Sequence, residues 1–224
     1  MKPIVPLNDP YMISSTGEFA WINIPKNASS FVRSMLDLNE WKSCKKQDLL
    51  DPEIKKICVL RDPVDRWISG FSQTMHDRQV KSCINLLDDK DFWRVILINP
   101  VFDDHTEHQH AFVDGIDNLQ YIYIQARDKE FGYIKNANKF YVDLANYISY
   151  TGGTGNRFSH WRKPINPSDS QSNKFEIFEK TRELVMKEHK SILEEHYKLD
   201  YLLLDQLTEF CYNKQDTIKE KHND

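Results

Sequence analysis

One segment constrains the fold of this chain most. It is an apolar run that ends at an arginine and is followed by a helical pattern. Residues 56–60, Lys-Ile-Cys-Val-Leu, are almost continuously apolar after the lysine, as in a strand buried on both faces of a sheet. Asp62 is a favoured helix N-cap and Pro63 suits the first helical position. Apolar residues then recur at helical spacing, at Val64, Trp67, Ile68 and Phe71. The segment predicts a strand, a tight turn and a helix.

The same order of elements is expected earlier in the chain. Residues 18–24 form an aromatic and β-branched run that stops at Pro25. Ser29 and Ser30 can cap a helix, and apolar residues follow at helical spacing over 31–38. Two strand–loop–helix units in succession favour parallel strands whose carboxyl ends lie at the same edge of a sheet.

The rest of the chain fits the same class. Further elements are predicted as helices at 91–98, 137–148, 173–197 and 200–212, a strand at 119–124 and a long surface loop at 152–172. The 224 residues show no composition break. We therefore expect an α/β fold, a single three-layer domain over residues 1–224 with a mainly parallel central sheet flanked by helices.

Charge and hydropathy exclude several classes. The net charge is −4, so the overall field does not favour nucleic acid or an anionic membrane as a partner. No stretch of about 18 apolar residues occurs, and the first residues lack the apolar core of a signal peptide. We expect a soluble, cytoplasmic protein without a membrane anchor, in which any anion-binding site is local.

Two segments are suited to phosphate. At Pro25–Ser30 a helix start supplies backbone N–H groups, and Lys26 adds an ammonium group. Arg61 ends the buried strand and can form two hydrogen bonds to phosphate, and Ser69 adds a hydroxyl. An ordinary capped helix and a structural pairing of Arg61 with Asp62 or Asp65 are the alternatives. The glycines of a Walker-type loop are absent, which disfavours ATP or GTP hydrolysis.

The two segments together resemble the donor-binding signatures of PAPS-dependent sulfotransferases, and the carbohydrate sulfotransferases most closely. Pro25-Lys26-Asn27-Ala28-Ser29-Ser30 is similar to their 5′-phosphosulfate loop, commonly P-K-x-G/A-S/C-T/S. Arg61 to Phe71 matches their 3′-phosphate signature, R-D-P-x-x-R-x-x-S-x-F, at every fixed position. Residues 197–203, Tyr-Lys-Leu-Asp-Tyr-Leu-Leu, resemble the Y-x-x-D-Y-x-L segment that often closes these domains, and we interpret them as packing.

The resemblance implies a P-loop-like strand–loop–helix and a set of donor contacts. The 5′-phosphosulfate would be held by the loop residues Lys26, Asn27, Ala28, Ser29 and Ser30. The 3′-phosphate would be held by Arg61 and Ser69. Lys26 is also suited to stabilise charge on the bridging oxygen as the sulfuryl group leaves.

The acid–base residues are expected in Asp103–His110, which holds three of the eight histidines. This region resembles the D-x-H-W-x-P-Q pattern of several carbohydrate sulfotransferases, with Asp103, His105 and Gln109 in register and Thr106 and His108 replacing its Trp and Pro. His105 is the predicted general base. Glu107 and His108 remain candidates.

Metal binding is the alternative function of that region. His105, His108 and a carboxylate could hold Zn²⁺ or Fe²⁺. A third ligand is not evident from the sequence, and no H-E-x-x-H motif occurs. We therefore expect no metal cofactor.

The predicted function is transfer of a sulfuryl group from PAPS to a hydroxyl, on a carbohydrate or other small acceptor, with release of PAP. A catalytically silent nucleotide-binding module and a nucleotide-dependent phosphotransferase are the alternatives. The sequence identifies neither the acceptor nor the oligomeric state.

Overall fold

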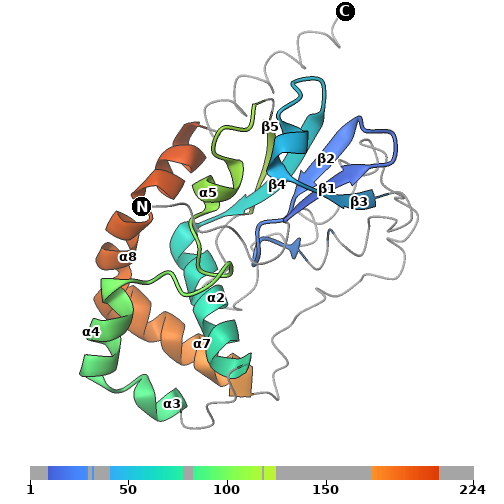
Figure 1. The fold of residues 1–224 in the computed structure, drawn as a ribbon. Coiled ribbons are helices and arrows are strands. Elements are labelled where there is room, and N and C mark those ends of the chain that lie inside the picture. The colour runs from blue at the N-terminus through green and yellow to red at the C-terminus, as the bar shows by residue number, and fades with distance from the viewer. Residues whose placement is uncertain are drawn as a thin grey trace, which may run out of the picture.

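The computed structural model describes residues 10–29, 32, 41–77, 83–117, 119–124 and 173–206 (Figure 1). The strands are β1 (Tyr11–Ser14), β2 (Phe19–Ile22), β3 (Trp41–Cys44), β4 (Lys55–Arg61) and β5 (Leu119–Ile124). The helices are α2 (Pro63–Asp77), α3 (Cys83–Leu86), α4 (Lys90–Ile98), α5 (Gln109–Val113), α7 (Asn173–Leu184) and α8 (Lys190–His196), with a 3-10 turn η1 (Lys46–Leu49) and a π-helical turn η3 (Val185–His189). Residues 198–206 are also helical.

The sheet is mixed, in the order β3-β1-β2-β4-β5. β2 pairs parallel with β4, and β4 pairs parallel with β5, while β1 pairs antiparallel with both β2 and β3. The expectation of a mainly parallel sheet is therefore wrong for half of it. The β1–β2 hairpin turns at Gly17, whose φ of 74° is in the left-handed region that glycine adopts without a steric penalty.

The predicted unit at 56–71 is confirmed. β4 is buried on both faces, with Cys58 fully buried on one face and Val59 2% exposed on the other. The Asp62 carboxylate accepts a hydrogen bond of 2.9 Å from the Asp65 N–H, as an N-cap does, and α2 follows from Pro63.

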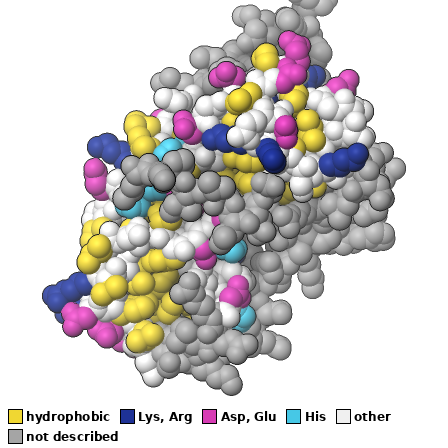
Figure 2. All heavy atoms as spheres, in the orientation of Figure 1, with side chains coloured by type: hydrophobic (Ala, Val, Ile, Leu, Met, Phe, Trp, Pro, Cys, Tyr) yellow, Lys and Arg dark blue, Asp and Glu magenta, His cyan; other side chains and the backbone are white. Residues whose placement is uncertain are grey.

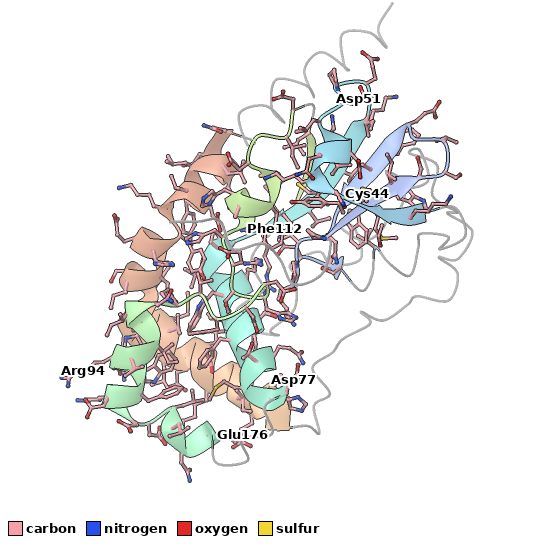
Figure 3. The ribbon with its side chains drawn as sticks, viewed as in Figure 1. Cys44, Asp51, Asp77, Arg94, Phe112 and Glu176 are labelled. Carbon is pink, nitrogen blue, oxygen red and sulfur yellow. The ribbon has the colours of Figure 1, made fainter. Side chains whose placement is uncertain are left out.

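Two hydrophobic clusters hold these elements. One joins a face of the sheet to α5 and to Leu204, and Phe112 extends from α5 into it (Figure 3). The second lies among α2, α4, α7 and α8, beyond the end of the sheet in Figure 1. In this cluster Trp67 stacks on Phe71 with ring centroids 4.9 Å apart, and Trp93 packs against both.

The remaining predictions divide between confirmed elements and undescribed segments. The helix at 91–98, the strand at 119–124 and the helix at 173–197 are confirmed as α4, β5 and the nearly continuous α7–η3–α8. The helix at 137–148, the loop at 152–172, most of the helix at 31–38 and the chain after 206 lie outside the described residues. The three-layer arrangement therefore stays a prediction.

The described surface has an apolar region at α4. The helix buries Trp93 on one side and leaves Val95 and Ile98 exposed on the other. Figure 2 shows hydrophobic side chains gathered over the lower left part of the surface, where Figure 1 places α4. Within the described part of the chain, no helix is both long and apolar enough to cross a membrane.

Candidate functional site

The loop after β2 has an unusual backbone. Lys26 and Ala28 have φ values of 67° and 58°, which non-glycine residues adopt at a cost of about 1–2 kcal/mol each. The intervening Asn27 has a negative φ. Because the Asn27 N–H donates to the Ile24 carbonyl at 3.3 Å, residues 24–27 form a β-turn in which Lys26 has the positive φ that a type II turn requires. The Val32 N–H donates to the Ala28 carbonyl at 3.0 Å, so a helical turn begins where the loop ends.

Asn27 holds this loop in place. Its side chain is 2% exposed, and Nδ2 donates to the carbonyl of Val59 on β4 at 2.8 Å and to Oε1 of Gln109 at 2.6 Å. Gln109 in turn pairs with both backbone groups of Arg61, accepting from its N–H at 3.0 Å and donating to its carbonyl at 2.8 Å. Three segments that are distant in sequence are thereby joined by two buried amides.

Arg61 lies where these segments meet. It ends β4, is 6% exposed, and donates from Nη1 to the carbonyl of Lys26 at 3.3 Å. Because β2 and β4 are parallel neighbours, the two predicted anion-binding segments leave the same edge of the sheet. The Asp62 carboxylate caps α2 and accepts from the Tyr201 hydroxyl at 3.2 Å.

Arg66 connects α2 to both loops. Its guanidinium is buried and donates from Nε to the Pro25 carbonyl at 3.0 Å, from Nη2 to the Asp104 carbonyl at 2.9 Å, and from Nη1 to the Glu107 carbonyl. Burial lowers the pKa of Arg66, because the charged form loses hydration. The signature arginine at this position is therefore a structural clamp.

His105 lies in a turn between Asp103 and Thr106. Its N–H donates to Asp103 Oδ1 at 3.0 Å, and the Thr106 hydroxyl accepts from the Phe102 N–H at 2.8 Å. Thr74 of α2 donates to Asp103 Oδ2 at 2.8 Å. Thr106, which replaces the Trp of the pattern, is fully buried and closes this turn.

Two carboxylates set the protonation of His105. Its Nδ1 lies 3.3 Å from Asp104 Oδ1 and 3.6 Å from Asp103 Oδ2, contacts that we regard as ion pairs rather than well-formed hydrogen bonds. Asp103 and then Asp104 raise the pKa of His105 to about 9. Burial opposes this change, but His105 is an imidazolium at neutral pH in this arrangement.

The neighbouring candidate bases differ from His105. Burial raises the pKa of Glu107, whose Oε1 accepts from the His108 N–H at 2.8 Å. Burial lowers the pKa of His108 to about 4, so its ring is neutral at pH 7. At pH 7 the His105 ring is therefore charged and the His108 ring neutral, although the two residues are only three positions apart in the sequence.

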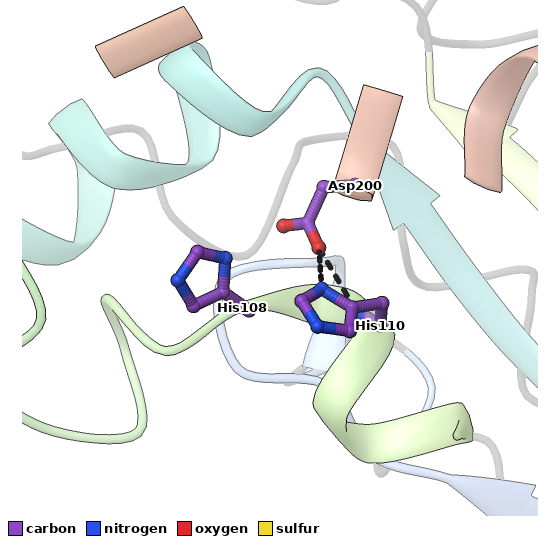
Figure 4. Close-up of side chains that lie close together, drawn as sticks. All are labelled: His108, His110 and Asp200. Atoms are coloured by element: carbon purple, nitrogen blue, oxygen red, sulfur yellow. Dashed lines mark hydrogen bonds and ion pairs between the residues drawn. The ribbon is translucent and has the colours of Figure 1, made fainter. Parts of the chain in front are cut away.

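Sequence reasoning missed Asp200. This residue follows α8, is fully buried, and accepts hydrogen bonds from the backbone N–H groups of Gln109 and His110 and from His110 Nδ1 at 2.8–2.9 Å (Figure 4). Its place in the Y-x-x-D-Y-x-L segment was the available signal, but that segment suggested only packing. Asp200 in fact holds the start of α5, and so helps to position Gln109.

The remaining predicted residues are only partly defined. The Ser29 hydroxyl donates to the Ile24 carbonyl at 2.8 Å and stabilises the loop. Ser69 is partly buried on α2, in the second turn beyond Arg61, and Ser30 lies outside the described residues. Asn27, predicted as a donor contact, uses its side chain within the protein; its contact with a donor stays a prediction.

Comparison of the chain with protein-family models, with curated proteins and with solved structures found no significant match.

Proposed function

We propose that this protein is a PAPS-dependent sulfotransferase that moves a sulfuryl group to a hydroxyl of a carbohydrate or other small acceptor and releases PAP. The sulfur–oxygen bond of the phosphosulfate breaks as the acceptor oxygen bonds to sulfur. The hydroxyl proton passes to a base on the protein. The proposal rests on the resemblance of Pro25–Ser30 and Arg61–Phe71 to the donor signatures of that family.

The observation that carries the proposal is the contact between the two signature segments. The Arg61 guanidinium meets the Lys26 carbonyl at the edge of the sheet, and Gln109 joins the third predicted segment to both. A donor with a phosphosulfate at one end and a 3′-phosphate near the other needs two anion sites side by side. The contact between the loop at Lys26 and the strand end at Arg61 supports such an arrangement.

The positive φ values of Lys26 and Ala28 in this loop support the same proposal. Left-handed residues are strained and persist only where surrounding contacts enforce them. Here the buried Asn27 side chain holds the loop at the start of a helical turn, where backbone N–H groups favour an anion, in a protein whose net charge is negative.

We assign His105 as the general base, and its charge makes this assignment testable. A base acts only after losing its proton, so the rate of transfer should rise with pH up to about 9, the pKa of His105. If His105 instead acted as a cation that stabilises the leaving charge, the rate would fall as pH passes 9. A pH-independent rate between 6 and 9 would count against His105 and favour Glu107 or His108.

The test is a transfer assay with labelled PAPS over sugars, glycans, lipids and small alcohols. We expect label in at least one hydroxyl acceptor, and expect His105→Ala to remove turnover while sparing PAP binding. Retained turnover in that variant would move the base to Glu107 or His108. If the protein binds PAP but neither transfers the label to an acceptor nor hydrolyses PAPS, it is a nucleotide-binding module and the enzyme proposal is overturned.

A further inference from the structure

Three histidines and one aspartate meet beside the start of α5. His108 and His110 come from the segment that begins this helix, His196 ends α8, and Asp200 lies in the helical turn after it. The ligand atoms of His108, His110 and Asp200 all lie within 4.8 Å of one another (Figure 4). The His196 ring stacks on the His108 ring with centroids 4.8 Å apart.

Asp200 supplies a buried negative charge to this cluster. Its carboxylate is fully buried, and Oδ1 faces His110 Nδ1 at 2.8 Å. A buried carboxylate is stable only beside a compensating positive charge or several donors. The His110 side chain is 31% exposed, so the cluster borders the molecular surface on that side.

Two imidazole nitrogens of the cluster are buried without a hydrogen-bond partner among the described residues. They are Nδ1 of His108 and Nε2 of His196. Buried polar atoms without partners are rare in folded proteins and call for an explanation, of which an unseen ion is one.

We propose that His108, His110 and Asp200 bind a divalent transition-metal ion of the Zn²⁺ type, with His196 or a water molecule as the fourth ligand. Imidazole nitrogens and a carboxylate oxygen form the usual donor set for such ions. In a four-coordinate site with metal–ligand bonds of about 2.0–2.2 Å, ligand atoms lie roughly 3.3–3.6 Å from one another, so the widest pair of this cluster must close by up to about 1.5 Å. Rotation of the half-buried His108 ring supplies this contraction. His110 Nδ1 gives up its proton to solvent when the ion binds.

This ligand set explains why the sequence suggested no metal. The expectation of none rested on the lack of a third ligand near His105 and His108. The third ligand is Asp200, which lies 90 residues beyond His110. The ion would fix the start of α5, and with it Gln109, against the helical residues 198–206. The proposal does not depend on the sulfotransferase assignment.

The test is titration of the full chain, stripped with a chelator, with ZnCl₂ in a calorimeter and with Co²⁺ monitored by visible absorption. We expect one ion per chain and a Co²⁺ spectrum typical of four-coordinate nitrogen and oxygen ligands. His108→Ala should weaken binding by at least about tenfold. This variant removes a ring whose Nδ1 has no partner among the described residues, so it should stay folded by circular dichroism.

The matched control is His76→Ala, at an exposed histidine on α2, which should bind Zn²⁺ as the wild type does. His105→Ala tests the neighbouring group of Asp103, Asp104 and His105, and it should also leave binding intact. The proposal is overturned if the wild type binds no Zn²⁺, if His108→Ala binds it undiminished, or if binding disappears in His105→Ala.

Discussion

Replacing Gly70 by alanine tests the contact between α2 and the His105 turn. A Cβ atom at Gly70 would lie 2.4 Å from the His105 carbonyl oxygen and 2.8 Å from the carbonyl carbon. These distances are far below van der Waals contact, so the turn must move by about 1 Å. Glycine is thus required here by close packing of two backbones.

The sign of the change in the free energy of unfolding shows whether this contact is present. Within a helix, alanine is favoured over glycine by about 1 kcal/mol, so without the contact Gly70→Ala would stabilise the protein. Overpacking of this kind costs about 1–3 kcal/mol. We therefore expect a net loss of up to about 2 kcal/mol in the free energy of unfolding, measured by urea denaturation followed by circular dichroism.

Function gives a second readout. Displacing His105 by about 1 Å should lower the transfer rate on the order of 100-fold while leaving PAP binding nearly unchanged. Gln73→Ala, at a partly exposed position one turn further along α2, is the control and should change stability by less than about 0.5 kcal/mol. A Gly70→Ala protein about 1 kcal/mol more stable than the wild type would refute the packing described.

Three further changes should affect stability in defined ways. Arg66→Ala should cost about 3 kcal/mol or more in chemical denaturation, because three carbonyls lose their donor. Asn27→Ala should cost about 2–3 kcal/mol, since Gln109 and the strained loop lose support; an unchanged midpoint would contradict this. The pKa of His105 is raised from 6.5 to about 9. Its charge therefore contributes stability that is fully present below pH 6.5 and is lost as pH rises through 9. Because its side chain is 36% exposed, we expect this loss to be about 1–2 kcal/mol, and absent in His105→Ala, in urea titrations from pH 6 to 10.

The parts of the fold that local sequence determines were predictable. The apolar run at 56–60 and the pair Asp62-Pro63 define β4 and the start of α2, because a buried strand and a helix cap each leave a signal within a few residues. The strand predicted at 18–24 is confirmed as β2, but its hairpin partner β1 was missed. β1 is only four residues long, and its burial depends on neighbours in the sheet rather than on an apolar run.

The connections that assemble the site could not be read from sequence. Gln109 pairs with Arg61 across 48 residues, and Asp200 holds His110 across 90. Such contacts have no fixed spacing, since they depend on how helices pack. Nor does the signature indicate that the three side-chain donors of Arg66 hold two loops together.

Calorimetric titration with PAP tests the central claim most directly. We expect the wild-type protein to bind PAP, and Arg61→Ala to lose this binding while its circular dichroism spectrum stays native. Arg94→Ala, at an exposed arginine on α4, is the matched control and should bind as the wild type does. Absence of heat from both PAP and PAPS with wild-type protein at high micromolar concentration, or equal affinity in Arg61→Ala, would contradict the account.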